Sequence, residues 1–190
     1  MKHPLQSRVV GPRHDEQELL DGAVQAVLEH GLAELTFGRL AKRLSVTDRM
    51  LVYYFTNKET LFEAVLGQLA GRLLERLELA FGQGRAPAAA LLRRSWPVLT
   101  DPEADRIFAA WFEFAGQAAA GHEPQRRLAA EMTGAWIDWL AERVDARTTA
   151  QRRSQAIRLV AMIDGALLLH HLGFPAEATQ VITTIGRAMP

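Results

Sequence analysis

Apolar residues recur at helical spacing in the first third of this chain and indicate two short helices joined by a tight turn. The apolar face of the first, at i, i+3, i+4 and i+7, consists of Phe37, Leu40, Ala41 and Leu44. Ser45 and Val46 interrupt this spacing, and Thr47 is an N-cap residue whose hydroxyl can accept a backbone N–H. Leu51 and Phe55 give the second helix a narrower apolar stripe. The pair is typical of a helix-turn-helix, whose second helix projects and fits the width of a DNA major groove.

Further helical stripes lie on both sides of this pair. The stripe before it consists of Leu20, Val24, Val27 and Leu28. Gly31 is the expected left-handed stop of that helix. After the pair, the residues from Thr56 to Glu59 fit a capping box, which predicts that a new helix begins there. Its apolar positions run from Phe62 to Phe81, so the helix spans roughly 35 Å and can connect two parts of the molecule.

The second half shows no alternation of the kind that strands require. Helix starts are indicated instead by Asp101-Pro102, by Pro124, by a capping box from Thr148 to Gln151, and by Pro175. We therefore predict an all-α fold, in which an N-terminal three-helix head is followed by a C-terminal helical bundle. The predicted divisions are a flexible basic arm at residues 1–14, the head at residues 15–62 and the bundle at residues 63–190.

Charge is unevenly distributed, although the net charge of the 190 residues is zero. The segment charges are +3 for residues 1–14, −6 for residues 15–35 and +4 for residues 36–58. A polyanion such as double-stranded DNA would be attracted to the arm and to the helix-turn-helix, and repelled by the first helix.

Several kinds of site are not expected. The sequence has no cysteine, which excludes disulfides and thiolate metal sites. The most apolar run, residues 159–172, is interrupted by Asp164 and by the pair His170-His171, so it is not expected to cross a membrane. Adjacent histidines on a helix point about 100° apart, so we expect no metal site there. We expect a cytoplasmic protein that needs no cofactor.

The helix-turn-helix region resembles the TetR family of bacterial transcriptional regulators. The residues that carry the resemblance are His30-Gly31-Leu32, Thr36, Leu40-Ala41, Val46-Thr47, Leu51-Val52-Tyr53-Tyr54-Phe55 and Lys58-Glu59-Thr60-Leu61. Three positions depart from the family's pattern: Ser45 replaces a Gly, Arg49 a small residue and Val52 a Tyr. The match spans residues 15–62, and its joint spacing is far more specific than a single helix-turn-helix pattern. Beyond that range the resemblance is architectural.

The resemblance also implies which residues meet DNA. Arg49 and Met50 would face base edges, where Arg can hydrogen-bond guanine twice and Met can contact a thymine methyl. The residues expected to hold phosphates are Thr36, Thr47, Tyr53, Tyr54 and Lys58. Tyr53 is also expected to pack partly against neighbouring helices. Lys58 lies in the first turn of a helix, where a cation is unfavourable unless an anion such as phosphate meets it.

Large aromatic residues gather in the second half, separated by alanines and glycines. Core packing explains any one of them, but as a set they favour a cavity for an apolar ligand, and the resemblance implies a small effector there. The residues assigned to this pocket are Trp96, Phe108, Trp111, Phe112, Met132, Trp136 and Asp164. Further candidates to orient a ligand are Glu113, Gln117 and Asp138. The Asp164 carboxylate needs a partner such as Arg158, or it implies a cationic or hydrogen-bonding ligand.

The last two predicted helices carry more apolar surface than one side of a helix needs. We assign the dimer interface to Ile163, Leu167, Val181, Ile182 and Ile185. Small residues among them, such as Gly165 and Ala178, allow close helix approach, which favours a four-helix interface with a second subunit. The alternative is a terminal hairpin buried within a monomer, but two-fold DNA sites favour the dimer.

Taken together, the patterns and the resemblance imply a homodimeric repressor that binds a near-palindromic operator and is released by a small hydrophobic effector. No Ser/His/Asp spacing, metal cluster or glycine-rich loop supports catalysis, so we do not expect an enzyme. The alternative functions are an all-helical enzyme and a protein-binding adaptor, either of which would act on a hydrophobic ligand in the aromatic C-terminal half.

Overall fold

The computed structural model describes residues 15–188, so the arm predicted for residues 1–14 lies outside the described residues. The helices of the described range are α1 (Glu16–His30), the 3₁₀ helix η1 (Leu32–Glu34), α2 (Phe37–Leu44), α3 (Asp48–Phe55), α4 (Lys58–Phe81), α5 (Ala88–Leu99), α6 (Pro102–Ala119), α7 (Glu123–Arg143), α8 (Thr149–His171) and α9 (Pro175–Ala188). In that range the only β-type pairing is an isolated bridge between Ala86 and Val144. The prediction of an all-α fold with an N-terminal helix-turn-helix is confirmed.

The head is formed by α1, α2 and α3, which turn their apolar stripes toward one another. Val27 of α1, Leu40 of α2 and Phe55 of α3 are all buried. The starts of α2 and α3 are fixed by Thr36 and Thr47, whose hydroxyls accept the backbone N–H groups of the residues three positions later. Local capping and inward-facing stripes together set the angle at which α3 packs against α2.

The turn between α2 and α3 depends on a residue in the left-handed region. Ser45 has φ 55° and ψ 39°, and it closes α2 with a bond from its N–H to the carbonyl of Ala41. This conformation favours glycine, because a Cβ at positive φ crowds the backbone. A glycine, which the family pattern has at this position, would adopt the left-handed conformation without strain, whereas Ser45 adopts it with some strain.

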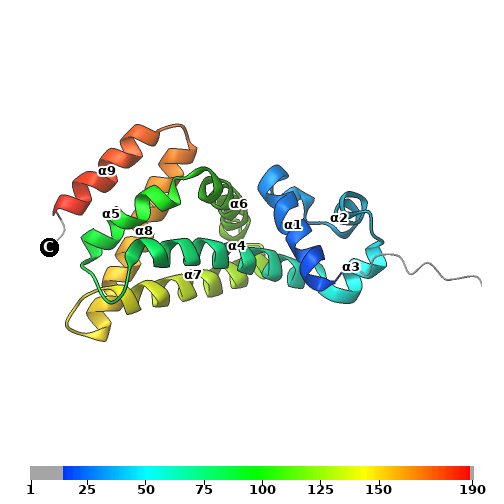
Figure 1. Cartoon of the computed structure of the whole chain (residues 1–190), viewed down its shortest axis with the longest axis horizontal. Helices are drawn as coiled ribbons and strands as arrows, with labels where there is room; N and C mark the ends of the chain where they lie inside the picture. Colours follow the sequence, from blue (N-terminus) through cyan, green and yellow to red (C-terminus); the bar gives the residue numbers. More distant parts are fainter. Residues whose placement is uncertain (1–14, 189–190) are drawn as a thin grey trace, which may run out of the picture.

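The long helix α4 leaves the head and runs into the body formed by α5 to α9 (Figure 1). Its N-cap is Asn57, whose Oδ1 accepts the N–H of Thr60 at 2.8 Å. The capping box predicted from Thr56 is therefore wrong by one residue. Thr56 has φ 47°, which is outside the extended region that an N-cap residue occupies.

Two ion pairs hold α7 alongside α4 in the body (Figure 1). Glu63 and Arg127 pair at 3.3 Å, and Glu78 and Arg143 pair at 2.7 Å. Helix α8 packs on α7 and α9, while α5 packs on α4 and α9. This arrangement brings α4, α6, α7 and α8 around one interior space.

Candidate functional site

The outer face of α3 is exposed while its inner face is part of the head's core. Leu51 and Phe55 are buried, whereas Arg49 and Val52 are exposed. Tyr53 is 79% exposed. A helix with this division presents one cationic and one aromatic side chain to an outside partner.

The two tyrosines of α3 differ in exposure, and the one predicted to pack against neighbouring helices is the more exposed. Tyr53 was expected to pack in part, but it is the more exposed of the two, and Tyr54 packs against the core. Their rings meet edge to face, with centroids 5.0 Å apart. Met50, which was placed at base edges, is half-buried and also packs against the core. Arg49 and Tyr53 are therefore the long exposed side chains of α3, beside the shorter Asp48 and Val52.

Lys58 is exposed at the first position of α4, close to the C-terminal end of α3. Its Nζ lies 5.3 Å from the ring centroid of Phe62, a cation–π contact that keeps the ammonium near the start of the helix. No ion pair within the described residues neutralises it. The positive end of α4 and the Lys58 ammonium thus lie at one surface, next to α3.

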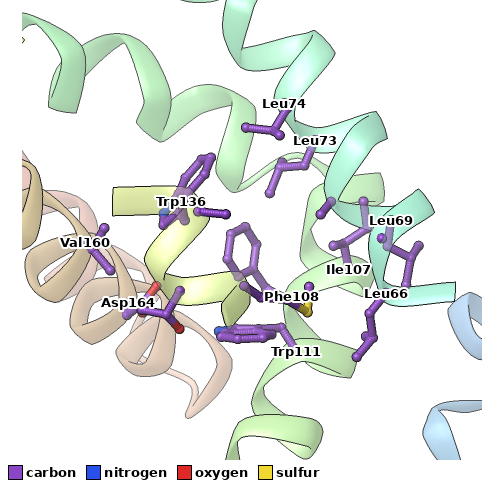
Figure 2. A pocket seen from close by; sticks show the side chains of 15 residues that line it. Leu66, Leu69, Leu73, Leu74, Ile107, Phe108, Trp111, Trp136, Val160 and Asp164 are labelled. Atoms are coloured by element: carbon purple, nitrogen blue, oxygen red, sulfur yellow. The ribbon is translucent and has the colours of Figure 1, made fainter. Parts of the chain in front are cut away.

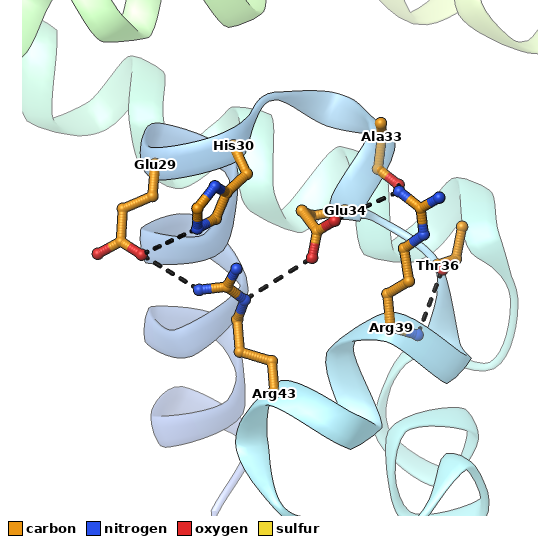
Figure 3. A network of polar contacts seen from close by, with 7 residues as sticks. All are labelled: Glu29, His30, Ala33, Glu34, Thr36, Arg39 and Arg43. Carbon is orange, nitrogen blue, oxygen red and sulfur yellow. Dashed lines mark hydrogen bonds and ion pairs between the residues drawn. The ribbon is translucent and has the colours of Figure 1, made fainter.

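Two arginines of α2 are paired within the head (Figure 3). Arg43 lies 3.1 Å from Glu29 and 3.7 Å from Glu34. Arg39 lies 3.3 Å from Glu34 and donates to the Ala33 carbonyl at 3.0 Å. These bonds fasten α2 to the end of α1 and to η1. The charge count of residues 36–58 therefore overstates the cationic surface, because sequence reasoning could not place the acidic partners.

The cations that form no ion pair among the described residues near α3 are Lys42, Arg49 and Lys58. They come from α2, α3 and the start of α4, and all three side chains are exposed. Lys42 was not among the predicted site residues, and only its place on the outer side of α2 could have indicated it. The exposed carboxylates of Asp48 and Glu59 on the same elements offset two of these charges, which leaves this surface with a small net positive charge suited to a polyanion.

The head is bonded to the body at two places. Gln68 of α4 donates to the Asp21 carboxylate of α1 at 2.5 Å, and Arg72 lies 3.8 Å from the same carboxylate. The hydrogen bond from Gln68, followed by one from Gln17, lowers the pKa of Asp21 below its ordinary value. At the second place, the N–H of Leu32 in η1 donates to Glu113 of α6 at 3.0 Å. Helices α4 and α6 are thus each bonded directly to the head.

The interior space between α4, α6, α7 and α8 is a cavity of about 200 Å³ (Figure 2). It is lined by Leu66, Gly67, Leu69, Ala70, Leu73, Leu74, Ile107, Phe108, Trp111, Met132, Thr133, Ala135, Trp136, Val160 and Asp164. Five predicted pocket residues are in this lining: Phe108, Trp111, Met132, Trp136 and Asp164. The α4 wall was missed, because its leucines are indistinguishable in sequence from ordinary core residues.

Two predicted pocket residues lie elsewhere. Trp96 is buried in the core, where its Nε1 donates to the Thr179 hydroxyl of α9 at 3.1 Å. Phe112 faces the ring of His171, with centroids 5.5 Å apart, and does not line the cavity. Phe112 follows Trp111 on α6, so its side chain points about 100° away from the cavity wall.

Asp164 is half-buried in the wall contributed by α8, and burial raises its pKa to about 6. Within the described residues it has no ion-pair partner, and Arg158 in particular does not pair with it. The other acidic candidates lie outside the cavity, because Glu113 binds the N–H of Leu32 and Asp138 pairs with Arg153. Gln117 is not in the lining either.

Three of the five residues predicted for a dimer interface are buried within the α8–α9 hairpin's own chain, so the prediction is wrong for these three. Ile163, Leu167 and Ile182 are 1%, 0% and 2% exposed, so they belong to the core of one chain. Helix α8 packs on α5 and α7, and α9 packs on α5, contacts that the sequence could not reveal. Ile185 is half-buried, and Val181 is exposed. The exposed large apolar residues of this hairpin are Ile157, Leu168, Leu169, Leu172, Phe174 and Val181.

Asp105 of α6 approaches both histidines at the end of α8. Its Oδ1 lies 3.3 Å from His170 Nε2 and 3.7 Å from His171 Nε2.

Nowhere in residues 15–188 do three or more His, Cys, Asp or Glu side chains form a group that could hold a metal ion. In the same residues no helix has the length and apolar character needed to cross a membrane.

Comparison with known proteins gives matches over the head and over most of the chain. Residues 19–65 match the sequence family described as bacterial regulatory proteins, tetR family. The HTH-type transcriptional regulator BetI of Serratia proteamaculans (strain 568) is 28% identical over 157 residues, which cover 80% of this chain and 78% of that protein.

Two crystal structures share the fold over nearly their whole length. A transcriptional regulator from Rhodococcus sp. Rha1 superposes with a TM-score of 0.71 at 21% identity, covering 91% of this chain and 94% of that one. The multidrug binding protein EbrR, crystallised with imidazole, superposes with a TM-score of 0.67 at 23% identity, covering 92% of this chain and 89% of that one. At these identities the likeness shows a common fold and nothing further.

Proposed function

Because this chain belongs to the tetR family of bacterial regulatory proteins and is a DNA-binding transcriptional regulator, we propose that it is a homodimeric repressor. The repressor holds a near-palindromic operator and releases it when a small organic molecule enters the cavity. The observation that carries this proposal is the exposed face of α3, on which Arg49 and Tyr53 project beside Lys42 and Lys58. The same chain has a largely apolar cavity between the helices that contact the head.

Contacts with DNA divide into reading and positioning. Arg49 enters the major groove with α3 and reads a base edge. Tyr53 and Lys58 hold phosphates on either side, and Lys42 adds a third basic contact that the sequence did not indicate. Thr36 and Thr47 use their oxygens as acceptors for capping, which leaves each hydroxyl hydrogen to donate to a phosphate. Met50 and Tyr54, being half-buried, support α3 from behind.

The second subunit docks on the α8–α9 hairpin. Leu172 and Phe174 are 64% and 50% exposed, and Ile157, Leu168 and Val181 extend the apolar surface along the two helices. Large apolar side chains exposed together on two packed helices favour a protein interface. A two-fold interface places two α3 helices on one side of the dimer, as a near-palindromic site requires.

Effector control follows from which helices form the cavity wall. Helix α4 begins at Lys58 and bonds to α1 through Asp21, while α6 bonds to η1 through Glu113. A ligand that binds better when α4 and α6 are displaced shifts the heads out of register with the operator. A differential affinity of about 3 kcal/mol between the two arrangements lowers operator affinity roughly a hundredfold.

The proposal is tested by selecting bound duplexes from random DNA and measuring affinity by fluorescence anisotropy at several salt concentrations. Lys58→Ala should weaken binding to all duplexes and lower the slope of log affinity against log salt by about one. Arg49→Ala should change the preferred sequence as well as the affinity. Arg85→Ala is the matched control, because it removes an exposed cation beyond the opposite end of α4. Selection of no duplex at low salt contradicts the proposal.

A further inference from the structure

The cavity is apolar on almost every side but contains one ionisable group. Of the residues that line it, Thr133 and Trp136 contribute neutral polar atoms, Trp111 contributes an indole N–H, and Asp164 is the single ionisable side chain. A carboxylate in such surroundings lacks the water that normally solvates it, so it requires either a protein partner or a ligand. The described residues supply no cationic partner.

Aromatic rings form the wall around this carboxylate. Figure 2 shows Phe108, Trp111 and Trp136 facing the same space as Asp164. Trp136 is fixed by stacking on Trp139, with centroids 5.1 Å apart and planes 5° from parallel. The faces of Trp and Phe rings attract cations, and this attraction strengthens when water is excluded. Aromatic faces and a carboxylate therefore favour the same kind of guest.

The volume indicates the size of the group that fits between the walls. A dry apolar cavity of roughly 150 Å³ accommodates benzene. At about 200 Å³, this cavity has room for one aromatic ring and a few more heavy atoms. A ring that carries a compact ammonium group fills the space and brings its charge to the wall.

We propose that the cavity binds small aromatic organic cations, with Asp164 as the counter-ion and Phe108, Trp111 and Trp136 as the aromatic wall. The inference rests on the proposed function, since it names the class of effector that the cavity would take. A neutral apolar molecule of the same shape fills the volume but leaves the carboxylate without a partner, so it binds less well. The raised pKa of Asp164 agrees with this, because the carboxyl is still largely ionised at pH 7.5 and a bound cation would favour that form.

The proposal is tested with phenyltrimethylammonium and with tert-butylbenzene, which has the same shape but no charge. Binding to the full chain without DNA is followed at pH 7.5 by tryptophan fluorescence, because Trp111 and Trp136 line the cavity. The wild type should bind the cation more tightly than the neutral compound. Asp164→Asn should weaken cation binding by about tenfold or more and leave binding of tert-butylbenzene equal or tighter.

Asp138→Asn is the matched control. It removes an acidic side chain from α7 that pairs with Arg153 outside the cavity, so cation binding should be unchanged. Circular dichroism and thermal melting establish that each variant is folded. The proposal is overturned if folded Asp164→Asn binds the cation as tightly as the wild type, if tert-butylbenzene binds better than the cation, or if the wild type binds no cation at millimolar concentration.

Adding operator DNA separates this inference from the proposed function. Cation binding that depends on Asp164 but leaves operator affinity unchanged supports the ligand class and contradicts effector control. Release of the operator by tert-butylbenzene, with no response to the cation, supports effector control and overturns the ligand class.

Discussion

Glu113 connects the cavity wall to the DNA-binding head, and its replacement by alanine should both destabilise the protein and uncouple the two parts. Its carboxylate accepts the N–H of Leu32 at 3.0 Å, and Leu32 is buried. The same helix, α6, lines the cavity with Phe108 and Trp111. The backbone bends at Gly31, with φ 79°, which directs the Leu32 N–H toward α6. Glu113→Ala leaves that N–H without its acceptor.

The magnitude follows from the type of bond that is lost. The Glu113 side chain is exposed and the bond is only part-buried, so water can partly replace the lost acceptor, and the bond contributes about 0.5–1.5 kcal/mol, as a typical protein hydrogen bond does. A loss of about 1 kcal/mol lowers the melting temperature of a chain of this size by roughly 2–4 °C. Glu113→Gln keeps a neutral oxygen acceptor, so it should lie between the wild type and Glu113→Ala.

Differential scanning calorimetry of the three proteins measures the effect, with Glu142→Ala as a control for the loss of a carboxylate. Glu142 has an 80% exposed side chain and lies 3.9 Å from Arg143, so its removal should change stability by less than about 0.5 kcal/mol. In anisotropy titrations, Glu113→Ala should bind operator as the wild type does but show a smaller loss of affinity when ligand is added. Equal melting temperatures for wild type and Glu113→Ala, together with an unchanged response to ligand, refute the reasoning.

Three further predictions concern backbone strain, pH and assembly. Ser45→Gly should raise the free energy of unfolding by about 1 kcal/mol, because glycine adopts the left-handed turn without strain; urea denaturation measures this, and a destabilised variant contradicts it. The pKa of Asp164 is raised from 3.8 to about 6, so its contribution to stability is present below pH 3.8 and lost as pH rises through 6. Asp164→Asn should therefore be more stable than wild type by up to about 3 kcal/mol at pH 7.5, with a difference that vanishes near pH 4; a difference independent of pH rules out this cause. Leu172→Glu should shift the protein toward monomer in analytical ultracentrifugation by placing a charge in the proposed interface, whereas Leu79→Glu, at an exposed leucine of α4, should not; dimer retention by Leu172→Glu contradicts that interface.

Local features of the head were predictable from sequence because they depend on neighbouring residues. Thr36 and Thr47 are N-caps, and each side chain accepts the backbone N–H of the residue three positions later. Ser45 occupies the turn position that the family pattern gives to glycine. The start of α4 shows the limit of such reasoning. Thr56 and Asn57 are both capable N-caps, and the path of the chain out of α3 decides in favour of Asn57.

The cavity was predictable only in part. The cluster of aromatic residues and the carboxylate in an apolar run correctly indicated that Phe108, Trp111 and Asp164 line a cavity. Trp96 and Phe112 are also large aromatic residues, but their side chains point elsewhere. Whether an aromatic side chain lines a cavity or fills a core depends on the crossing angles of helices distant in sequence, which periodicity does not encode.

The sequence by itself determined the helices, most of their caps and the exposed second helix of the helix-turn-helix, since these follow from interactions within one or two turns. The tertiary structure decided which charges and apolar faces remain available. It pairs Arg39 and Arg43 with carboxylates of α1 and η1, and it buries Ile163 and Leu167 against other helices of the same chain. Both outcomes depend on how helices approach one another, because a side chain is free or occupied only once its neighbours from distant parts of the chain are in place.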